Sequence, residues 1–191
     1  MGSSSWSDVF PPVDYRPTGY NKQHSEKTKS KSFANLNLSG AFHVRELELA
    51  GWKIEFDREA TVAAHNQLTI GGPESCTCDY CRNWAQTRLR VLPASFQQLL
   101  ERLGIPLDRE CEVYQCAKLE SGLHLYGGWY HFVGRVVKGE REGSSHVALG
   151  TFSVFFASKP DLLPRAFVGF PVVQLGFEAT IPWLSDIPEL G

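Results

Sequence analysis

Three cysteines lie within six residues of this chain, in the run CTCDYC that contains Cys76, Cys78 and Cys81. Thiolate sulfur is a preferred ligand of zinc, which takes four ligands at the corners of a tetrahedron. The two residues between Cys78 and Cys81 let both sulfurs turn toward one point, and Cys76 adds a third sulfur if the backbone bends at Thr77. This spacing predicts a thiolate-rich, zinc-binding site.

A zinc site of this kind needs a fourth ligand, and the spacing around the three cysteines does not identify one. Imidazole nitrogen is another common zinc ligand in proteins, so a histidine is the expected donor. The candidates are His65, His124 and His131, with Cys111 and Cys116 as thiol alternatives. We therefore predict that one of these histidines completes the site.

The same thiols are also compatible with redox chemistry, because a helix is expected to begin near Asp79, directly after Cys78. The amide groups and dipole at a helix N-terminus favour thiolate, which lowers the pKa of a cysteine there. Cys78 would then be the attacking thiol, with Cys81 or Cys76 as the resolving thiol. Against this, the carboxylate of Asp79 disfavours a thiolate beside it, and no βαβ unit surrounds the motif as in thioredoxin-like folds.

Packing is the third interpretation of the thiols. Free cysteine is among the most buried residue types and packs like a small hydrophobe. Cys81 shares one apolar helical stripe with Trp84 and Ala85, so this cysteine is also a candidate core residue. The sequence leaves metal binding, redox chemistry and packing open, and the spacing favours a metal.

A second unusual stretch, LHLYGGWYHFV, has two glycines between aromatic residues. A two-residue Gly-Gly turn would make it a β-hairpin with His124 opposite His131, close enough for both imidazoles to share a ligand. A continuous strand would instead place these histidines on opposite faces, and aromatic rings of neighbouring strands could lie over the bare glycine backbone. The candidate ligand or partner surface is formed by Tyr126, Trp129 and Tyr130, and the alternative for these rings is packing in the core.

Helical periodicity is predicted once, in the middle of the chain. Apolar residues recur at i, i+3, i+4 and i+7 between Cys81 and Leu92, and Pro93 ends that run. A second helix follows as far as Leu103, with Gly104 as its left-handed C-cap. The two helices are predicted to form a helical hairpin.

Alternating apolar residues and β-branched or aromatic residues between glycine and proline breaks predict strands on both sides of this hairpin. The expected strands cover residues 41–45, 52–56, 61–63, 67–70, 112–114, 123–137, 147–157 and 172–181. The fold class is therefore α+β, a mostly antiparallel sheet interrupted by a central helical hairpin.

Composition divides the chain into an arm and a domain. Residues 1–32 combine prolines with a polar, lysine-containing tract, and such a segment cannot bury enough apolar surface to offset the entropy of ordering it. We expect this segment to be a flexible N-terminal arm. Residues 33–191 have the composition and length of a single globular α+β domain.

Charge and cysteine usage exclude several classes of protein. The net charge is −2 with no basic stripe, which argues against nucleic acid as a partner. No apolar run has the roughly 18 residues of a membrane span, and the first residues lack the apolar core of a signal peptide. An odd count of five cysteines argues for reduced thiols over a disulfide framework. We therefore expect a cytoplasmic protein that does not contact membranes.

Three motifs resemble a group of small uncharacterised bacterial proteins: CTCDYCRNW, the LGI at the end of the second helix, and GWYHFVG. The similarity covers about residues 40–137, and the first motif is the most specific. The resemblance implies a bacterial cytoplasmic protein. It carries no activity, ligand or site.

These observations favour a small soluble binding or structural module, with a zinc site at a strand-to-helix junction, over an enzyme. The first alternative is a thiol-disulfide enzyme or redox sensor that uses Cys78 and Cys81. The second is a plain protein-interaction domain without a metal. No motif identifies the partner, whether a protein or a small molecule.

Overall fold

The computed structural model describes residues 43–139 and 146–189, and all of them belong to one compact unit. The predicted N-terminal arm, residues 1–32, lies outside the described residues, as do residues 33–42 at the start of the predicted domain. The strand predicted at residues 41–45 is therefore seen only from residue 43 onward.

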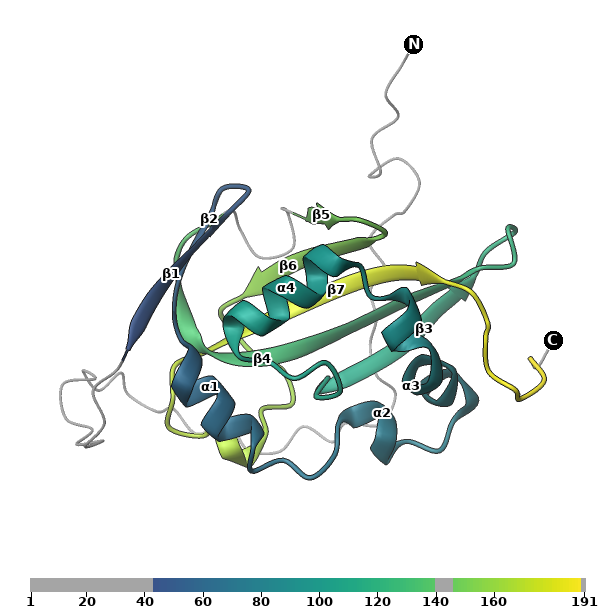
Figure 1. Cartoon of the computed structure of the whole chain (residues 1–191), viewed down its shortest axis with the longest axis horizontal. Coiled ribbons are helices and arrows are strands. Elements are labelled where there is room, and N and C mark those ends of the chain that lie inside the picture. The colour runs from purple at the N-terminus through teal and green to yellow at the C-terminus, as the bar shows by residue number, and fades with distance from the viewer. Residues whose placement is uncertain (1–42, 140–145, 190–191) are drawn as a thin grey trace, which may run out of the picture. The chain divides into compact units, whose positions relative to one another are not determined.

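The described residues form an antiparallel sheet of seven strands (Figure 1). The strands are β1 (Val44–Leu49), β2 (Trp52–Asp57), β3 (Glu112–Lys118), β4 (His124–Lys138), β5 (Val147–Leu149), β6 (Phe152–Ala157) and β7 (Val172–Ile181). Their order is β1-β2-β4-β7-β6-β5, with β3 also paired to β4. The long strand β4 is central, since β3 pairs with its first half, β2 with its second half and β7 with both.

The α-helices lie between β2 and β3 in the chain. They are α1 (Arg58–His65), α2 (Gly72–Ser75), α3 (Asp79–Val91) and α4 (Ala94–Leu103). The predicted α+β class is confirmed, as are the two central helices, α3 and α4. Their packing as a hairpin stays a prediction. No helix of the described residues is both long and apolar enough to cross a membrane.

The end of α4 follows the predicted C-cap. Gly104 has a φ of 80°, in the left-handed region. Its amide donates to the carbonyl of Glu101, and the amide of Ile105 donates to that of Leu100 at 2.9 Å. These two bonds form a Schellman motif, which satisfies carbonyls that the helix leaves free.

The main core lies between the sheet and the helices α3 and α4. Trp84 of α3 stacks on Phe177 of β7 with ring centroids 5.1 Å apart, and Phe96 of α4 lies 5.2 Å from Phe152 of β6. All four rings are buried, and burying one such side chain contributes roughly 1.5–3 kcal/mol. Trp84 also contacts Phe152, and Phe96 also contacts Phe177. The two helices therefore cover the same face of the sheet.

The strand predicted at residues 61–63 is wrong, because this segment belongs to α1, and so is the expectation of helix only in the middle of the chain. Asp57 caps α1: its carboxylate accepts from the amide of Ala60 at 2.8 Å. Thr61, Ala64 and His65 are buried at helical spacing. The cap and this spacing outweigh the β propensity of the segment. The strand predicted at residues 67–70 is also wrong, since these residues form turns and bends before α2.

The Gly-Gly pair lies inside β4, so the hairpin geometry is wrong and the continuous-strand geometry is confirmed. Gly127 and Gly128 pair with β3 on one side and with β7 on the other. A Cβ atom on Gly128 would lie 2.6 Å from the ring of Phe177, and one on Gly127 would lie 2.7 Å from the ring of Tyr114. The glycines are there because rings from both neighbouring strands lie over them.

The other predicted strands agree with the structure. Those at residues 52–56, 112–114 and 172–181 are confirmed as β2, β3 and β7. The strand predicted at residues 147–157 is divided into β5 and β6, which pair as a hairpin.

Candidate metal centre

The sulfur atoms of Cys76, Cys78 and Cys81 all lie within 4.8 Å of one another, and those of Cys76 and Cys78 are 3.3 Å apart. Sulfurs bound to one tetrahedral zinc ion at about 2.3 Å lie about 3.8 Å from each other. The three sulfurs are therefore close enough to bind one metal ion. We refer to these three residues as the thiol cluster.

The thiol cluster lies where α2 ends and α3 begins. Cys76 and Cys78 have extended backbone conformations, and Cys78 is the N-cap of α3. The amide of Cys78 points at the sulfur of Cys76, and the amide of Cys81 points at the sulfur of Cys78, each at 3.5 Å. Amides directed at sulfur stabilise a thiolate, so the chain bend that gathers the sulfurs also favours the charged form of Cys76.

Cys76 and Cys81 differ in their tendency to ionise. The amide of Cys78 lowers the pKa of Cys76, which is exposed together with Cys78. Burial raises the pKa of Cys81, which is 4% exposed and directs its thiol at the carbonyl of Val113. Since metals bind the thiolate form, a metal must displace the proton of Cys81. The lowered pKa of Cys76 was not expected from the sequence, which singled out Cys78 as the reactive thiol.

No histidine completes the thiol cluster within the described part of the chain, where the group of candidate ligands contains only the three cysteines. His65 of α1 bonds through Nε2 to the backbone carbonyl of His131 at 2.9 Å, and both rings lie against Phe167. The other two cysteines also lie outside the group. Cys111 directs its thiol at the carbonyl of Leu162, and Cys116 is exposed on β3.

His124 and His131 do not meet, because they lie seven residues apart on one strand and so face opposite sides of the sheet. His124 faces the side covered by α3, where it lies 5.3 Å from the ring of Trp183. Its Nε2 atom is 3.0 Å from a carboxylate oxygen of Glu189. The predicted pairing of the two imidazoles around one ligand is therefore wrong.

The predicted aromatic ligand surface is wrong for two of its three rings. Tyr126 and Tyr130 are fully buried, and only Trp129 is partly exposed. The hydroxyl of Tyr126 donates to the carbonyl of Tyr80, inside the first turn of α3. That of Tyr130 donates to the carbonyl of Leu107. Tyr126 thus bonds to the first turn of α3, beside the thiol cluster, instead of contacting a ligand.

Asn83 is a supporting residue that sequence reasoning missed. It is fully buried, and its carbonyl oxygen accepts from the amides of Leu184 and Ser185 at 2.9 and 3.0 Å. Its amide group donates to the Tyr126 hydroxyl at 3.2 Å. Asn83 therefore fastens the segment after β7 to the helix turn that carries Cys81. A polar residue two positions after Cys81, on the turn that also holds Trp84, was the only available signal.

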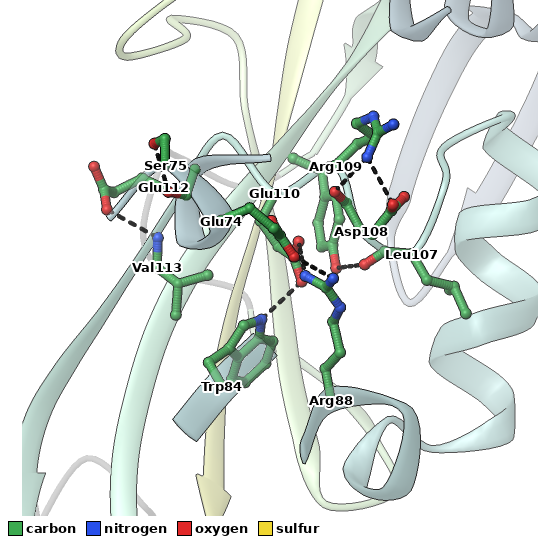
Figure 2. A network of polar contacts seen from close by, with 12 residues as sticks. Glu74, Ser75, Trp84, Arg88, Leu107, Asp108, Arg109, Glu110, Glu112 and Val113 are labelled. Carbon is green, nitrogen blue, oxygen red and sulfur yellow. Dashed lines mark hydrogen bonds and ion pairs between the residues drawn. The ribbon is translucent and has the colours of Figure 1, made fainter. Parts of the chain in front are cut away.

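An ionic network joins α2, α3 and the segment before β3 (Figure 2). The guanidinium of Arg88, on α3, pairs with Glu74 of α2 and lies 3.1 Å from Glu110, which precedes β3. The indole of Trp84 donates to the same Glu110 at 2.7 Å. Burial raises the pKa of Glu110, and Arg88 opposes that rise. Because Glu74 lies two residues before Cys76, the network fixes α2, and with it Cys76, relative to α3.

Comparisons with known proteins do not supply a function. No protein-family model, no curated protein and no solved structure matches this chain. The resemblance to the bacterial group therefore stays a prediction, and the function must be argued from the thiol cluster itself.

Proposed function

We propose that this protein is a binding or structural module that holds one zinc ion through Cys76, Cys78 and Cys81. The observation that carries the proposal is the approach of all three sulfurs to within 4.8 Å of one another. Soft thiolate ligands in a tetrahedral arrangement favour zinc among the common divalent ions. All five cysteines are free, as expected for the reducing cytoplasm.

The fourth ligand position is the distinctive part of this proposal. No further histidine, cysteine or carboxylate of the described residues joins the sulfurs. Cys76 and Cys78 are exposed, so we place the fourth position on the solvent side of the cluster. A water molecule or a partner side chain can occupy it, which is typical of exchangeable zinc sites rather than closed structural ones.

Metal content tests the proposal directly. Protein purified without chelator should contain one zinc ion per chain, and a Cys78→Ser, Cys81→Ser double variant should contain none. Cys116→Ser is the matched control, since this exposed cysteine lies outside the cluster. Replacing zinc by Co²⁺ should produce a thiolate-to-metal charge-transfer absorption in the wild type and the control only. Metal-free wild-type protein, or a double variant that keeps its zinc, would overturn the proposal.

A second candidate function is thiol-disulfide exchange, favoured by the 3.3 Å between the sulfurs of Cys76 and Cys78. In this case Cys76 is the attacking thiol, because its pKa is lowered by the amide of Cys78. The alkylation rate of Cys76 should then titrate below the ordinary cysteine pKa of about 8.5. A rate that follows the ordinary pKa in metal-free protein would exclude this function.

A further inference from the structure

A pocket of about 230 Å³ is lined by residues from six segments of the chain, α2 among them. Its lining includes His65 from α1, Ile70 from the following loop, Cys111 before β3, His131 from β4 and Phe167 from the 3-10 helix Arg165–Phe167. We call it the histidine pocket. Its volume is below the roughly 300–1,000 Å³ of pockets for drug-sized ligands, so it suits a molecule of one or two rings.

One residue that lines the histidine pocket, His65, has an acceptor without a donor. His65 is 2% exposed, and its Nε2 atom lies 2.9 Å from the carbonyl oxygen of His131. A carbonyl only accepts, so Nε2 carries the hydrogen, and in a neutral imidazole the other nitrogen, Nδ1, is then an acceptor. That Nδ1 atom is buried and has no hydrogen-bond partner among the described residues. An unpaired buried acceptor costs free energy that a ligand donor would recover.

His131 adds a second under-satisfied ring. It is 1% exposed, and neither of its nitrogens makes a hydrogen bond of good geometry, although Gln174 and the backbone of Asp161 lie close by. Burial is the main cause that lowers the pKa of both His65 and His131 to about 4. Both rings are therefore neutral at physiological pH, and a neutral donor suits them better than an anion.

The lining includes two charged residues, Arg109 and Glu110, which are already in ion pairs with Asp108 and Arg88, and apolar residues besides. Ile70, in the lining, is 52% exposed. Leu162, whose carbonyl meets the thiol of the lining residue Cys111, is 64% exposed, and Val168, next to Phe167, is 67% exposed. Of these three residues only Ile70 lines the pocket, where its exposed apolar side chain is available to a ligand. The ring of Phe167 supplies an aromatic wall beside both imidazoles.

We propose that the histidine pocket binds a small, neutral aromatic molecule whose N–H or O–H group donates a hydrogen bond to Nδ1 of His65. The apolar body of the ligand packs between Phe167 and Ile70, and the donor lies at the inner end of the pocket. Because Nδ1 is covered in the unliganded protein, the lining side chains shift slightly as the ligand enters, as is common at binding sites. This proposal does not depend on metal binding by the thiol cluster.

The test uses two probes of the same size. Indole has an apolar bicyclic body and one N–H donor, whereas benzofuran has the same shape with an oxygen in place of the N–H. In a titration followed by NMR, indole should bind saturably and shift the ¹⁵N resonance of His65 Nδ1. Benzofuran should bind about tenfold more weakly, since it leaves the buried acceptor unpaired. Absence of saturable indole binding, or equal binding of both probes, would overturn the proposal.

Two variants locate the bound probe. Ile70→Ser removes an apolar contact from an exposed position, so it should fold normally and weaken indole binding by about threefold to tenfold. Leu89→Ser is the matched control, because Leu89 is 69% exposed on α3 and does not line the pocket, and it should leave indole binding unchanged. In a His65→Phe variant the preference for indole over benzofuran should disappear. Equal indole affinity in Ile70→Ser and wild type would place the probe elsewhere and refute the assignment.

Discussion

The thiol cluster and the histidine pocket both contain metal-capable side chains, thiols in the first and imidazoles in the second, in opposite environments. In the thiol cluster two of three sulfurs are exposed, and backbone amides point at two of them. In the histidine pocket both imidazoles are buried, and three of their four ring nitrogens have no partner. The first environment favours the charged form of Cys76, and the second favours neutral rings.

This difference shows what turns ligand residue types into a site. The cysteines converge because a short helix, an extended segment and a helix cap follow one another within a few residues. His124 and His131 diverge because an odd number of steps along β4 reverses the side of the sheet. Convergence of side chains is thus a property of the backbone, and composition alone does not reveal it.

The largest expected effect is a loss of stability at acidic pH, where protonation gives the histidine pocket a charge and so removes its contrast with the thiol cluster. The pKa values of His65 and His131 are about 4 in the folded protein and about 6.5 when unfolded. Below pH 6.5 the unfolded chain takes up protons that the folded chain refuses, so stability falls as the pH drops toward 4 and is unaffected by these groups above 6.5. Urea unfolding of metal-free protein at pH 7 and pH 4.5 should show a loss of roughly 2–3 kcal/mol for each histidine.

A His131→Leu variant provides the control for this measurement. The ring of His131 makes no hydrogen bond of good geometry, so an apolar replacement of similar size should be tolerated at pH 7. Between pH 7 and pH 4.5 the variant should lose roughly 2 kcal/mol less than the wild type. The same acid sensitivity in both proteins would show that other groups are responsible.

The second effect concerns the support of the thiol cluster. Asn83→Ala removes the acceptor of two backbone amides and the donor to Tyr126, all close to α3. The free energy of unfolding should fall by roughly 2 kcal/mol, because these partners stay buried or half-buried without replacement. Gln86→Ala is the matched control on the same helix, with one exposed bond to Asp186, and should change stability by less than about 0.5 kcal/mol. Equal effects of the two substitutions would contradict the role of Asn83.

The smallest expected effect is on metal affinity. It comes from a substitution that loosens α2, beside the thiol cluster, without changing a cysteine. Glu74→Gln weakens the pair with Arg88 that ties α2 to α3. Mutation of a residue that orients a metal ligand typically lowers metal affinity roughly 10–100-fold. Because Glu74 makes only one of the contacts that hold α2 in place, we expect metal affinity to fall by about threefold to tenfold. Competition between the protein and a zinc chelator measures this loss. Glu120→Gln, at an exposed position, should leave the affinity unchanged, and an unchanged affinity in Glu74→Gln would exclude the network from metal binding.

Local signals in the sequence were sufficient for the thiol cluster and for the helices α3 and α4. Cysteine spacing brings the three sulfurs together, an acidic residue in the first turn marks the start of α3, and Gly104 marks the end of α4. Each of these signals acts within a few residues, where backbone geometry leaves few alternatives.

Features that depend on distant partners could not be predicted in the same way. Gly127 and Gly128 have the same sequence signal in a hairpin turn and under the rings of neighbouring strands. The rings of Tyr114 and Phe177, which lie elsewhere in the chain, favour the continuous strand over the hairpin turn. The helix α1 was missed because Thr61 and Val62 are β-branched, while its cap, Asp57, also ends a strand. For Asn83 the partners lie about a hundred residues away.

Asn83 acts as a clamp, because it hydrogen-bonds the segment after β7 to α3, and this clamp forms only after the cysteines have been synthesised. Its partners Leu184 and Ser185 follow it by 101 and 102 residues, so the ribosome releases α3 and all three cysteines long before the clamp can close. Until residue 185 emerges, the helix turn that carries Cys81 lacks the hydrogen bonds between Asn83 and the amides of Leu184 and Ser185. A nascent chain can therefore meet zinc, or an oxidant, while its sulfurs are still loosely arranged. The proposed metal site should reach its full affinity only after residue 185 has emerged.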